Sequence, residues 1–120
     1  MNCGRRQKGW QGEEVAATFL KEQGYHLRER NFRCPLGEID IVAEEGGEIV
    51  FIEVRTRSSS AFGLPQESID FRKQNRLRRL ASFYLKQRKL HGQPCRFDVV
   101  AVLLNGQGRV ARIELIRGAF

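Results

Sequence analysis

The stretch GEIDIVAEEGGEIVFIEVR, residues 37–55, holds two apolar runs separated by a pair of glycines. Two consecutive glycines between strands are typical of a two-residue hairpin turn. If Gly46 and Gly47 form that turn, residues whose numbers sum to 93 face each other. Asp40 then lies opposite Glu53, with their Cβ atoms about 5 Å apart. The stretch therefore predicts an antiparallel hairpin that brings two carboxylates together.

The two faces of the predicted hairpin differ in character. Alternation along each strand places Asp40 and Glu53 on one face, and apolar side chains on the other. The apolar face comprises Ile39, Ile41, Ala43, Val50, Ile52 and Val54. Like charges directly opposite each other destabilise a hairpin, and a divalent cation is the simplest candidate to neutralise them. The hairpin thus predicts a metal site at Asp40 and Glu53.

The alternative is a solvated outer face on which Glu38 and Arg55 form a weak surface ion pair. Apolar residues argue against that alternative, because three of them share the charged face: Val42, Ile49 and Phe51. A face that is partly covered and holds two acids is a candidate metal site.

The rest of the chain alternates between helical and strand patterns. Apolar spacing and turn residues predict a helix over 13–23, a strand over 25–32, a loop over 58–65, a helix over 67–89, and strands over 97–104 and 110–116. The element order is α-β-β-β-α-β-β. A chain of 120 residues suffices for one core. We expect a single α/β domain over residues 1–120, with a central mixed β-sheet and helices on both sides.

Positive charge is concentrated in two acid-free stretches. The net charge is +7, and residues 71–97 hold nine bases and no acid. Within this stretch Lys73, Arg76 and Arg79 recur at three-residue spacing and can fall along one side of the helix. The second stretch carries Arg5, Arg6 and Lys8. Clustered bases favour a polyanion partner such as nucleic acid. The alternatives are a solvated basic helix face and a docking surface for an acidic protein.

The three cysteines indicate a reducing compartment. They form no Cys-x-x-Cys motif and are odd in number, so we expect free thiols and a cytoplasmic protein. A zinc site at His91 and Cys95 would lack a second ligand pair. No apolar run is long enough to span a membrane, and the N-terminus carries no apolar segment of a signal peptide. We therefore expect no membrane association.

Together these motifs resemble a known group of nucleases. Gly12-Glu13 in a helix, the GEID motif ending at Asp40 and an apolar strand ending in Glu53-Val54-Arg55 look like the PD-(D/E)xK nuclease superfamily, in its Holliday-junction-resolvase-like branch. The whole chain is also similar to the small bacterial YraN-like family. The segments that carry this second resemblance are GWQGE (9–13), FGLPQE (62–67) and RFDVV (96–100).

The resemblance implies a restriction-endonuclease-like fold and a Mg²⁺- or Mn²⁺-dependent endonuclease acting on DNA, including branched DNA, as a homodimer whose two sites face one junction. It assigns Asp40 and Glu53 to the metal-binding acids and Glu13 to the helix-borne acid. By itself, Glu13 could instead complement the dipole of a helix that it opens. The alternative to an enzyme is a non-catalytic nucleic-acid-binding module on the same fold.

Arg55 departs from the nuclease pattern, because it occupies the position usually held by lysine. Arginine cannot give up its proton in a protein. Its planar fork can still hold a phosphate oxygen and stabilise negative charge in a transition state. We therefore expect catalytic roles for Glu13, Asp40, Glu53 and Arg55. Lys73 would steady the phosphate with Arg55. The alternative for Lys73 is a stem packed on the core with its head in water.

Overall fold

The computed structural model describes residues 3–58 and 69–120, with side chains from Gln11 onward. Its elements are α1 (Cys3–Glu22), β1 (His26–Cys34), β2 (Gly37–Glu45), β3 (Glu48–Ser58), α2 (Phe71–Gln87), β4 (Cys95–Leu104) and β5 (Val110–Ile116). The predicted order α-β-β-β-α-β-β is confirmed. Apart from Ser58, which ends β3, the loop expected over 58–65 lies outside the described residues. No helix of the described residues is long and apolar enough to cross a membrane.

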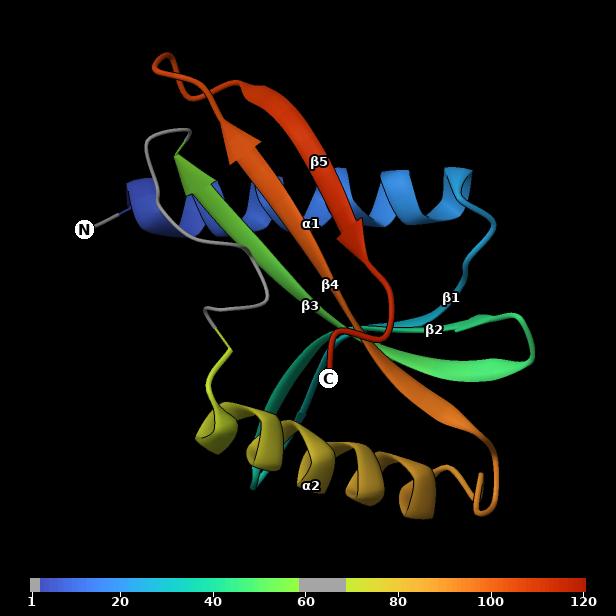
Figure 1. Cartoon of the computed structure of the whole chain (residues 1–120). Coiled ribbons are helices and arrows are strands. Elements are labelled where there is room, and N and C mark those ends of the chain that lie inside the picture. The colour runs from blue at the N-terminus through green and yellow to red at the C-terminus, as the bar shows by residue number, and fades with distance from the viewer. Residues whose placement is uncertain (1–2, 59–68) are drawn as a thin grey trace.

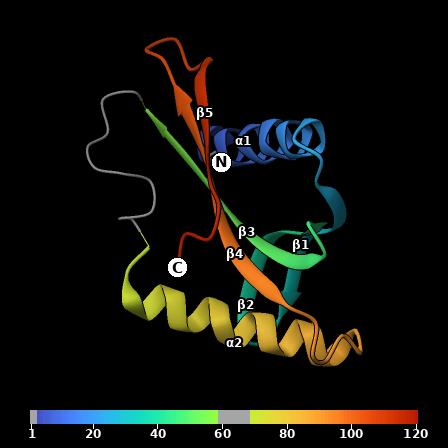
Figure 2. The ribbon, with the colours of Figure 1, turned by 45° about the vertical axis from the view of Figure 1, so that its right-hand side comes forward.

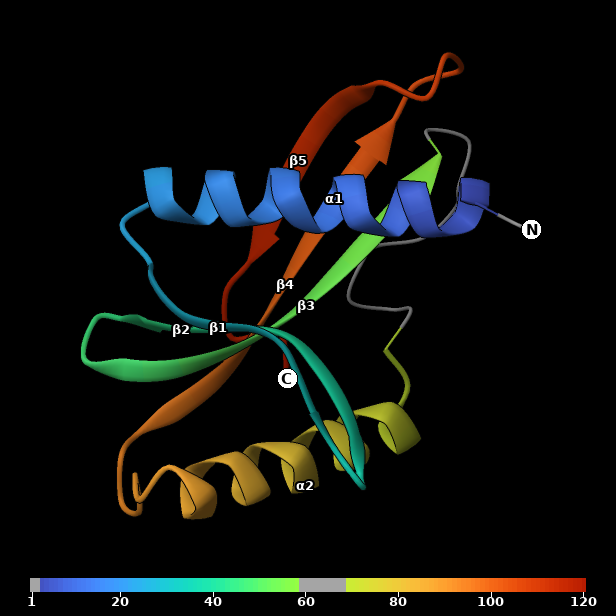
Figure 3. The same cartoon turned by 180° about the vertical axis from the view of Figure 1, so that it is seen from behind.

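The five strands form one mixed sheet in the order β1-β2-β3-β4-β5. Strands β3 and β4 are parallel, and the other neighbours are antiparallel. A parallel pair needs a long connection, and α2 lies in it. Helix α1 crosses one face of the sheet and α2 the other (Figures 1 and 3), with the strongly twisted sheet between them (Figure 2). The predicted α/β fold, with helices on both sides of a central sheet, is confirmed.

Each face of the sheet carries its own apolar core. On the α1 side the buried side chains are Ala16, Ala17, Leu20, Tyr25, Ile41, Ala43, Val50, Ile52, Val100, Val102 and Leu104. On the α2 side they are Phe32, Ile39, Val42, Ile49, Phe51, Ile69, Leu77, Leu80, Ala81, Tyr84 and Val99. The α2-side core includes the three apolar residues that were expected to cover the charged face of the hairpin.

The hairpin has the predicted register over most of its length. Gly46 and Gly47 have φ angles of 61° and 80°, the left-handed conformation that glycine adopts without strain. The pairing runs from Glu45 and Glu48 at the turn to Ile41 and Ile52. It stops there. The expected direct pairing of Asp40 with Glu53 is therefore wrong, because β2 and β3 diverge at this level (Figure 1).

An irregularity in β1 and β2 accompanies this divergence. Their pairing passes from Arg30 and Ile41 to Phe32 and Ile39 and skips Asn31 and Asp40. Asn31 has a φ of 54°, which is uncommon for a residue other than glycine and less so for asparagine. As a result Ile39 packs on the α2 side, whereas Ile41 packs on the α1 side. The prediction that these two isoleucines share a face is wrong, because simple alternation breaks down at Asp40.

Both helices differ from the predicted ranges at their starts. Helix α1 begins at Cys3 instead of Glu13, since residues 3–10 carry few apolar side chains and give little periodic signal. Helix α2 begins at Phe71, after the N-cap Asp70, whose carboxylate accepts a hydrogen bond from the Lys73 amide. Gly12 lies inside α1, where an added Cβ would come within 2.0 Å of Thr56 Oγ1 on β3. This close approach sets α1 against β3 and places Glu13 over the end of the hairpin.

Candidate functional site

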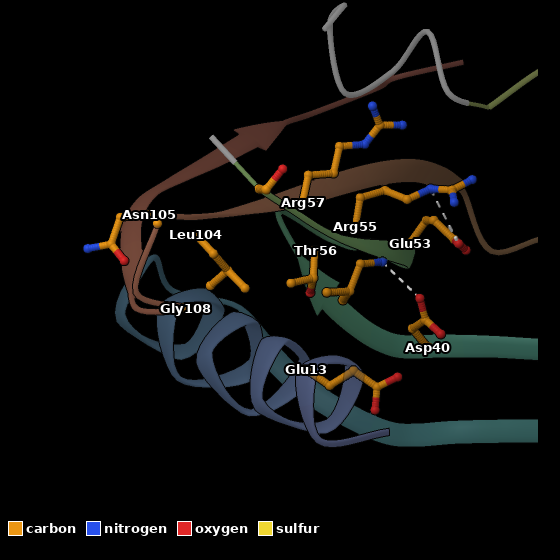
Figure 4. Close-up of a pocket in the computed structure, with 12 residues that line it drawn as sticks. Glu13, Asp40, Glu53, Arg55, Thr56, Arg57, Leu104, Asn105 and Gly108 are labelled. Carbon is orange, nitrogen blue, oxygen red and sulfur yellow. Dashed lines mark hydrogen bonds and ion pairs between the residues drawn. The ribbon is translucent and has the colours of Figure 1, made fainter. Parts of the chain in front are cut away.

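Acidic side chains from three elements meet where β2 and β3 diverge. Glu13 on α1, Asp40 on β2 and Glu53 on β3 line one open pocket of about 760 Å³ (Figure 4). Arg55 lines the same pocket. The far side of the pocket consists of the end of β3 and the turn between β4 and β5, at Thr56, Arg57, Ser58, Leu104, Asn105, Gly106 and Gly108. The four residues expected to be catalytic are thus brought together.

Asp40 is held by the backbone of the neighbouring strand. Its Oδ2 accepts a hydrogen bond from the Val54 amide at 2.8 Å. Burial, followed by the negative charge of Glu53, raises the pKa of Asp40 from 3.8 to about 7. The Val54 hydrogen bond opposes this rise without cancelling it. The ionised Asp40 carboxylate is therefore not fully neutralised by its surroundings, and a bound cation would neutralise it.

Glu13 and Glu38 stand beside Asp40 on the α1 side of the sheet. One carboxylate oxygen from each of Glu13, Glu38 and Asp40 lies within 4.8 Å of the other two. Burial and the charge of Glu38 raise the pKa of Glu13. Because α1 begins ten residues earlier, at Cys3, Glu13 is not in its first turn, which removes the helix-dipole alternative for this residue.

Glu38 has a different partner from the one expected. The pairing of Glu38 with Arg55 was expected beyond the level at which β2 and β3 separate. Glu38 instead pairs with Arg33, at 3.3 Å between Oε2 and Nε. Sequence reasoning missed Glu38 as a member of the acidic group. Its place two residues before Asp40 in the same strand was the signal that could have found it.

Positive groups surround Glu53 on the other side of the site. Lys73 Nζ on α2 lies 2.9 Å from Glu53 Oε1, and Arg55 Nε lies 3.8 Å from the same oxygen. The Glu53 side chain is 11% exposed and that of Lys73 26%. Lys73 therefore points toward the sheet, instead of continuing an exposed row with Arg76 and Arg79.

Asn31 completes the acidic side of the site. When its side-chain amide is assigned from its surroundings, the amide nitrogen donates to Glu13 Oε2 at 3.2 Å and to Glu38 Oε1 at 3.1 Å. Sequence reasoning missed Asn31, since a single asparagine in a strand pattern gives no signal of a left-handed backbone. Its position in space, between two acids, becomes evident only in the fold.

The chemistry of this group fits a hard divalent cation. Its candidate ligand atoms are three carboxylate oxygens, one each from Glu13, Glu38 and Asp40, which lie within 4.8 Å of one another. Mg²⁺ and Mn²⁺ prefer oxygen ligands. Among the side chains that the structure describes, those of residues 11–58 and 69–120, no other group of three acidic, histidine or cysteine side chains gathers in this way. The alternative zinc site at His91 and Cys95 therefore has no third ligand among the described residues.

The basic stretch divides into paired and exposed residues. Arg88 forms two hydrogen bonds with Glu29, at 2.7 and 2.8 Å, while Lys73 reaches Glu53. Arg76 and Arg79 are exposed on α2. The other exposed bases of this stretch are Arg72, Arg78, Lys86 and Lys89. Arg5, Arg6 and Lys8 fall within α1, and their side chains lie outside the described part of the chain.

A second charged cluster lies at the turn end of the hairpin and is fully paired. Asp98, which is 1% exposed, accepts hydrogen bonds from Tyr25 at 2.7 Å and from Arg96 at 3.1 Å. Arg96 also contacts Glu45 and Glu48. These contacts connect β4 to the hairpin turn, so the RFDVV segment serves the fold.

A family model described as "Uncharacterised protein family UPF0102" matches residues 12–102. The chain belongs to this family. A UPF0102 protein of Moorella thermoacetica is 63% identical over 120 residues, covering both chains completely. A UPF0102 protein of Caldicellulosiruptor saccharolyticus is 48% identical over 116 residues, which is 97% of this chain and 98% of the relative. Membership of UPF0102 confirms the YraN-like family predicted from the sequence, and the matched range contains the whole acidic site.

Proposed function

We propose that this UPF0102 protein is a Mg²⁺- or Mn²⁺-dependent endonuclease-like protein that binds DNA and cleaves its phosphodiester bonds, branched DNA included. The observation that carries the proposal is the convergence of Glu13, Asp40 and Glu53 in one pocket with Arg55 and Lys73 beside them. Acids that can hold a cation, next to bases that can hold a phosphate, are what phosphodiester hydrolysis requires. The resemblance to PD-(D/E)xK nucleases supports the same reading.

Asp40 would hold the cation, with Glu13 on one side and Glu53 on the other. When bound, Mg²⁺ would polarise the phosphodiester and make a coordinated water more acidic. Asp40 is suited to this role because its carboxylate is buried and surrounded by negative charge. Glu38 has a carboxylate oxygen within 4.8 Å of those of Glu13 and Asp40, and adds to the negative potential that attracts the ion.

The remaining side chains would act on the substrate. Arg55 and Lys73, which both reach Glu53, would contact the phosphate oxygens and stabilise their growing charge. Glu13 faces the pocket, so it would orient the attacking water beside the ion. The exposed bases of α2, Arg76 and Arg79 among them, would hold the neighbouring phosphates.

The test is cleavage of linear duplex, single-stranded and four-way-junction DNA with Mg²⁺ or Mn²⁺. We expect metal-dependent nicking that is lost in Asp40→Asn, a variant of nearly unchanged shape. Molar mass measured with and without a junction tests the homodimer. Absence of cleavage of every DNA form, in a protein that binds the cation, would contradict the proposed activity.

The second candidate is a non-catalytic DNA-binding module, which Arg55 at the usual lysine position favours. In that case binding to DNA would persist without cleavage and would be equally strong in Asp40→Asn. The cleavage assay and a binding assay on the same two proteins separate the two candidates.

A further inference from the structure

We propose that Asn31 belongs to the cation site and that its side-chain amide flips when the ion binds, so that its nitrogen and oxygen exchange places. Without the ion, the amide nitrogen of Asn31 holds Glu13 and Glu38 together. With the ion, the amide oxygen of Asn31 faces it as a neutral ligand. The inference rests on the cation site of the proposed function and adds to it a residue that the sequence motifs do not mark.

The position of the amide supports both orientations. One terminal atom of the amide lies 3.1 Å from Glu38 Oε1, and 3.2 and 3.3 Å from the two oxygens of Glu13. A nitrogen there donates to both acids, whereas an oxygen there faces only other oxygens. The second arrangement becomes favourable when a cation lies among these oxygens. The amide nitrogen and oxygen have nearly the same size, so turning the group needs no movement of the backbone.

The backbone conformation of Asn31 places its side chain in this position. Its φ of 54° is left-handed, and the pairing of β1 with β2 skips both Asn31 and Asp40. A left-handed backbone is unusual within a strand, although asparagine adopts it more readily than most residues. The irregularity leaves Asn31 and Asp40 free of the regular alternation, so that both side chains can lie near Glu13.

A neutral amide suits a site that already has several charges. Glu13, Glu38 and Asp40 carry three carboxylates within 4.8 Å, and a fourth would increase their repulsion in the absence of an ion. An NH₂ group instead donates to two of them and keeps the ligands near their bound positions. The ion then meets a prearranged site, which lowers the cost of binding.

The first test uses two replacements that tolerate a positive φ. Asn31→Gly keeps the backbone conformation and removes the amide, and Asn31→Asp keeps the shape but has no donor. Asn75→Asp on α2 is the matched control for the added charge. Mg²⁺ affinity is measured by titration calorimetry, and melting temperature with and without Mg²⁺, all in the absence of DNA.

We expect Asn31→Gly to weaken Mg²⁺ binding about ten- to a hundredfold, the usual loss when a group supporting a metal site is removed. Asn31→Asp should melt lower without Mg²⁺, yet bind the ion at least as tightly as the wild type. Asn75→Asp should change neither quantity. Unchanged Mg²⁺ affinity in Asn31→Gly, or weaker binding in Asn31→Asp, would overturn the proposal.

The second test follows the side-chain NH₂ signals of Asn31 by NMR. Without Mg²⁺ its hydrogen-bonded protons should exchange slowly with water. Saturating Mg²⁺ should shift them and speed their exchange, whereas a purely structural amide would keep slow exchange. If the wild type binds Mg²⁺ and these signals stay unchanged, the Asn31 proposal fails and the proposed function stands. If they respond as expected and no DNA is cut, the endonuclease activity fails and Asn31 remains a ligand. A wild type that binds no Mg²⁺ overturns both.

Discussion

Lys73 Nζ on α2 lies 2.9 Å from Glu53 Oε1 on β3, across twenty residues of sequence. The ammonium thus stands beside an acid that Arg55 also approaches. We expect Lys73→Met to lower cleavage about ten- to a hundredfold, because Arg55 alone would hold the phosphate. Arg72→Met, an exposed neighbour on the same helix, is the control. Equal losses in the two variants, measured as single-turnover rates, would remove Lys73 from the site.

Arg55 occupies the position of the usual lysine, and its guanidinium keeps its charge. Arg55→Lys should raise cleavage about ten- to a hundredfold, since a compact ammonium can take part in proton transfer. Arg55→Ala should lower it. If the Arg55→Lys protein cuts DNA less well than the wild type, the guanidinium of arginine is the group that cleavage requires. It would bind the phosphate through two hydrogen bonds.

Asp40 should make thermal stability and Mg²⁺ binding depend on pH in opposite directions. Its pKa is raised from 3.8 to about 7, so the folded protein holds a proton that the unfolded chain releases. This contribution to stability is complete below about pH 4 and is lost as pH rises through about 7. Mg²⁺ competes with that proton, so the rise in melting temperature in about 10 mM Mg²⁺ should grow over the same range.

Asp40→Asn supplies the comparison for these scans. It should melt higher than the wild type near neutral pH without Mg²⁺ and show little response to the ion. The difference between the two proteins isolates Asp40 from the other titrating groups. A wild type whose response to Mg²⁺ is the same at pH 5 and pH 8 would show that Asp40 is not a ligand.

The exposed bases of α2 should set the salt dependence of DNA binding. Replacing Arg76 and Arg79 by glutamine should weaken binding about equally for all sequences, and lower the slope of log K against log salt by roughly one unit per lost phosphate contact. Lys21→Gln with Arg112→Gln removes the same charge from exposed positions on α1 and β5. If both double variants change the slope equally, binding follows net charge and not this helix.

Gly12 should be required for the docking of α1. A Cβ at this position would lie 2.0 Å from Thr56 Oγ1, and such crowding costs about 1–3 kcal/mol, partly offset by the better helix propensity of alanine. The Gly12→Ala protein should therefore unfold at a lower denaturant concentration. It should also bind Mg²⁺ less well, because Glu13 would be displaced. Thr56→Ala should rescue it in the double variant. Additive effects of the two changes would show that these residues do not touch.

The sequence was sufficient to predict the fold, but it predicted only part of the site. Two glycines and strict alternation fix the hairpin register from its turn to Ile41, because turn chemistry and burial point the same way. The gap at Asp40 could not be predicted, since it accompanies the left-handed backbone of Asn31, for which the strand pattern carries no signal. For the same reason Glu38 was placed beside Arg55, although the divergence of β2 and β3 turns it toward Glu13.

The hydrogen bond from the Val54 amide to Asp40 gives the site a reporter of its own. In a regular ladder a backbone carbonyl would accept this bond, and its strength would not vary. Here the acceptor is a carboxylate that can take up a proton or turn toward a cation. The Val54 amide lies where β2 and β3 separate. Its hydrogen–deuterium exchange rate therefore reports whether the site is occupied. The amide proton can be followed in the unsubstituted protein, and the measurement needs no substrate.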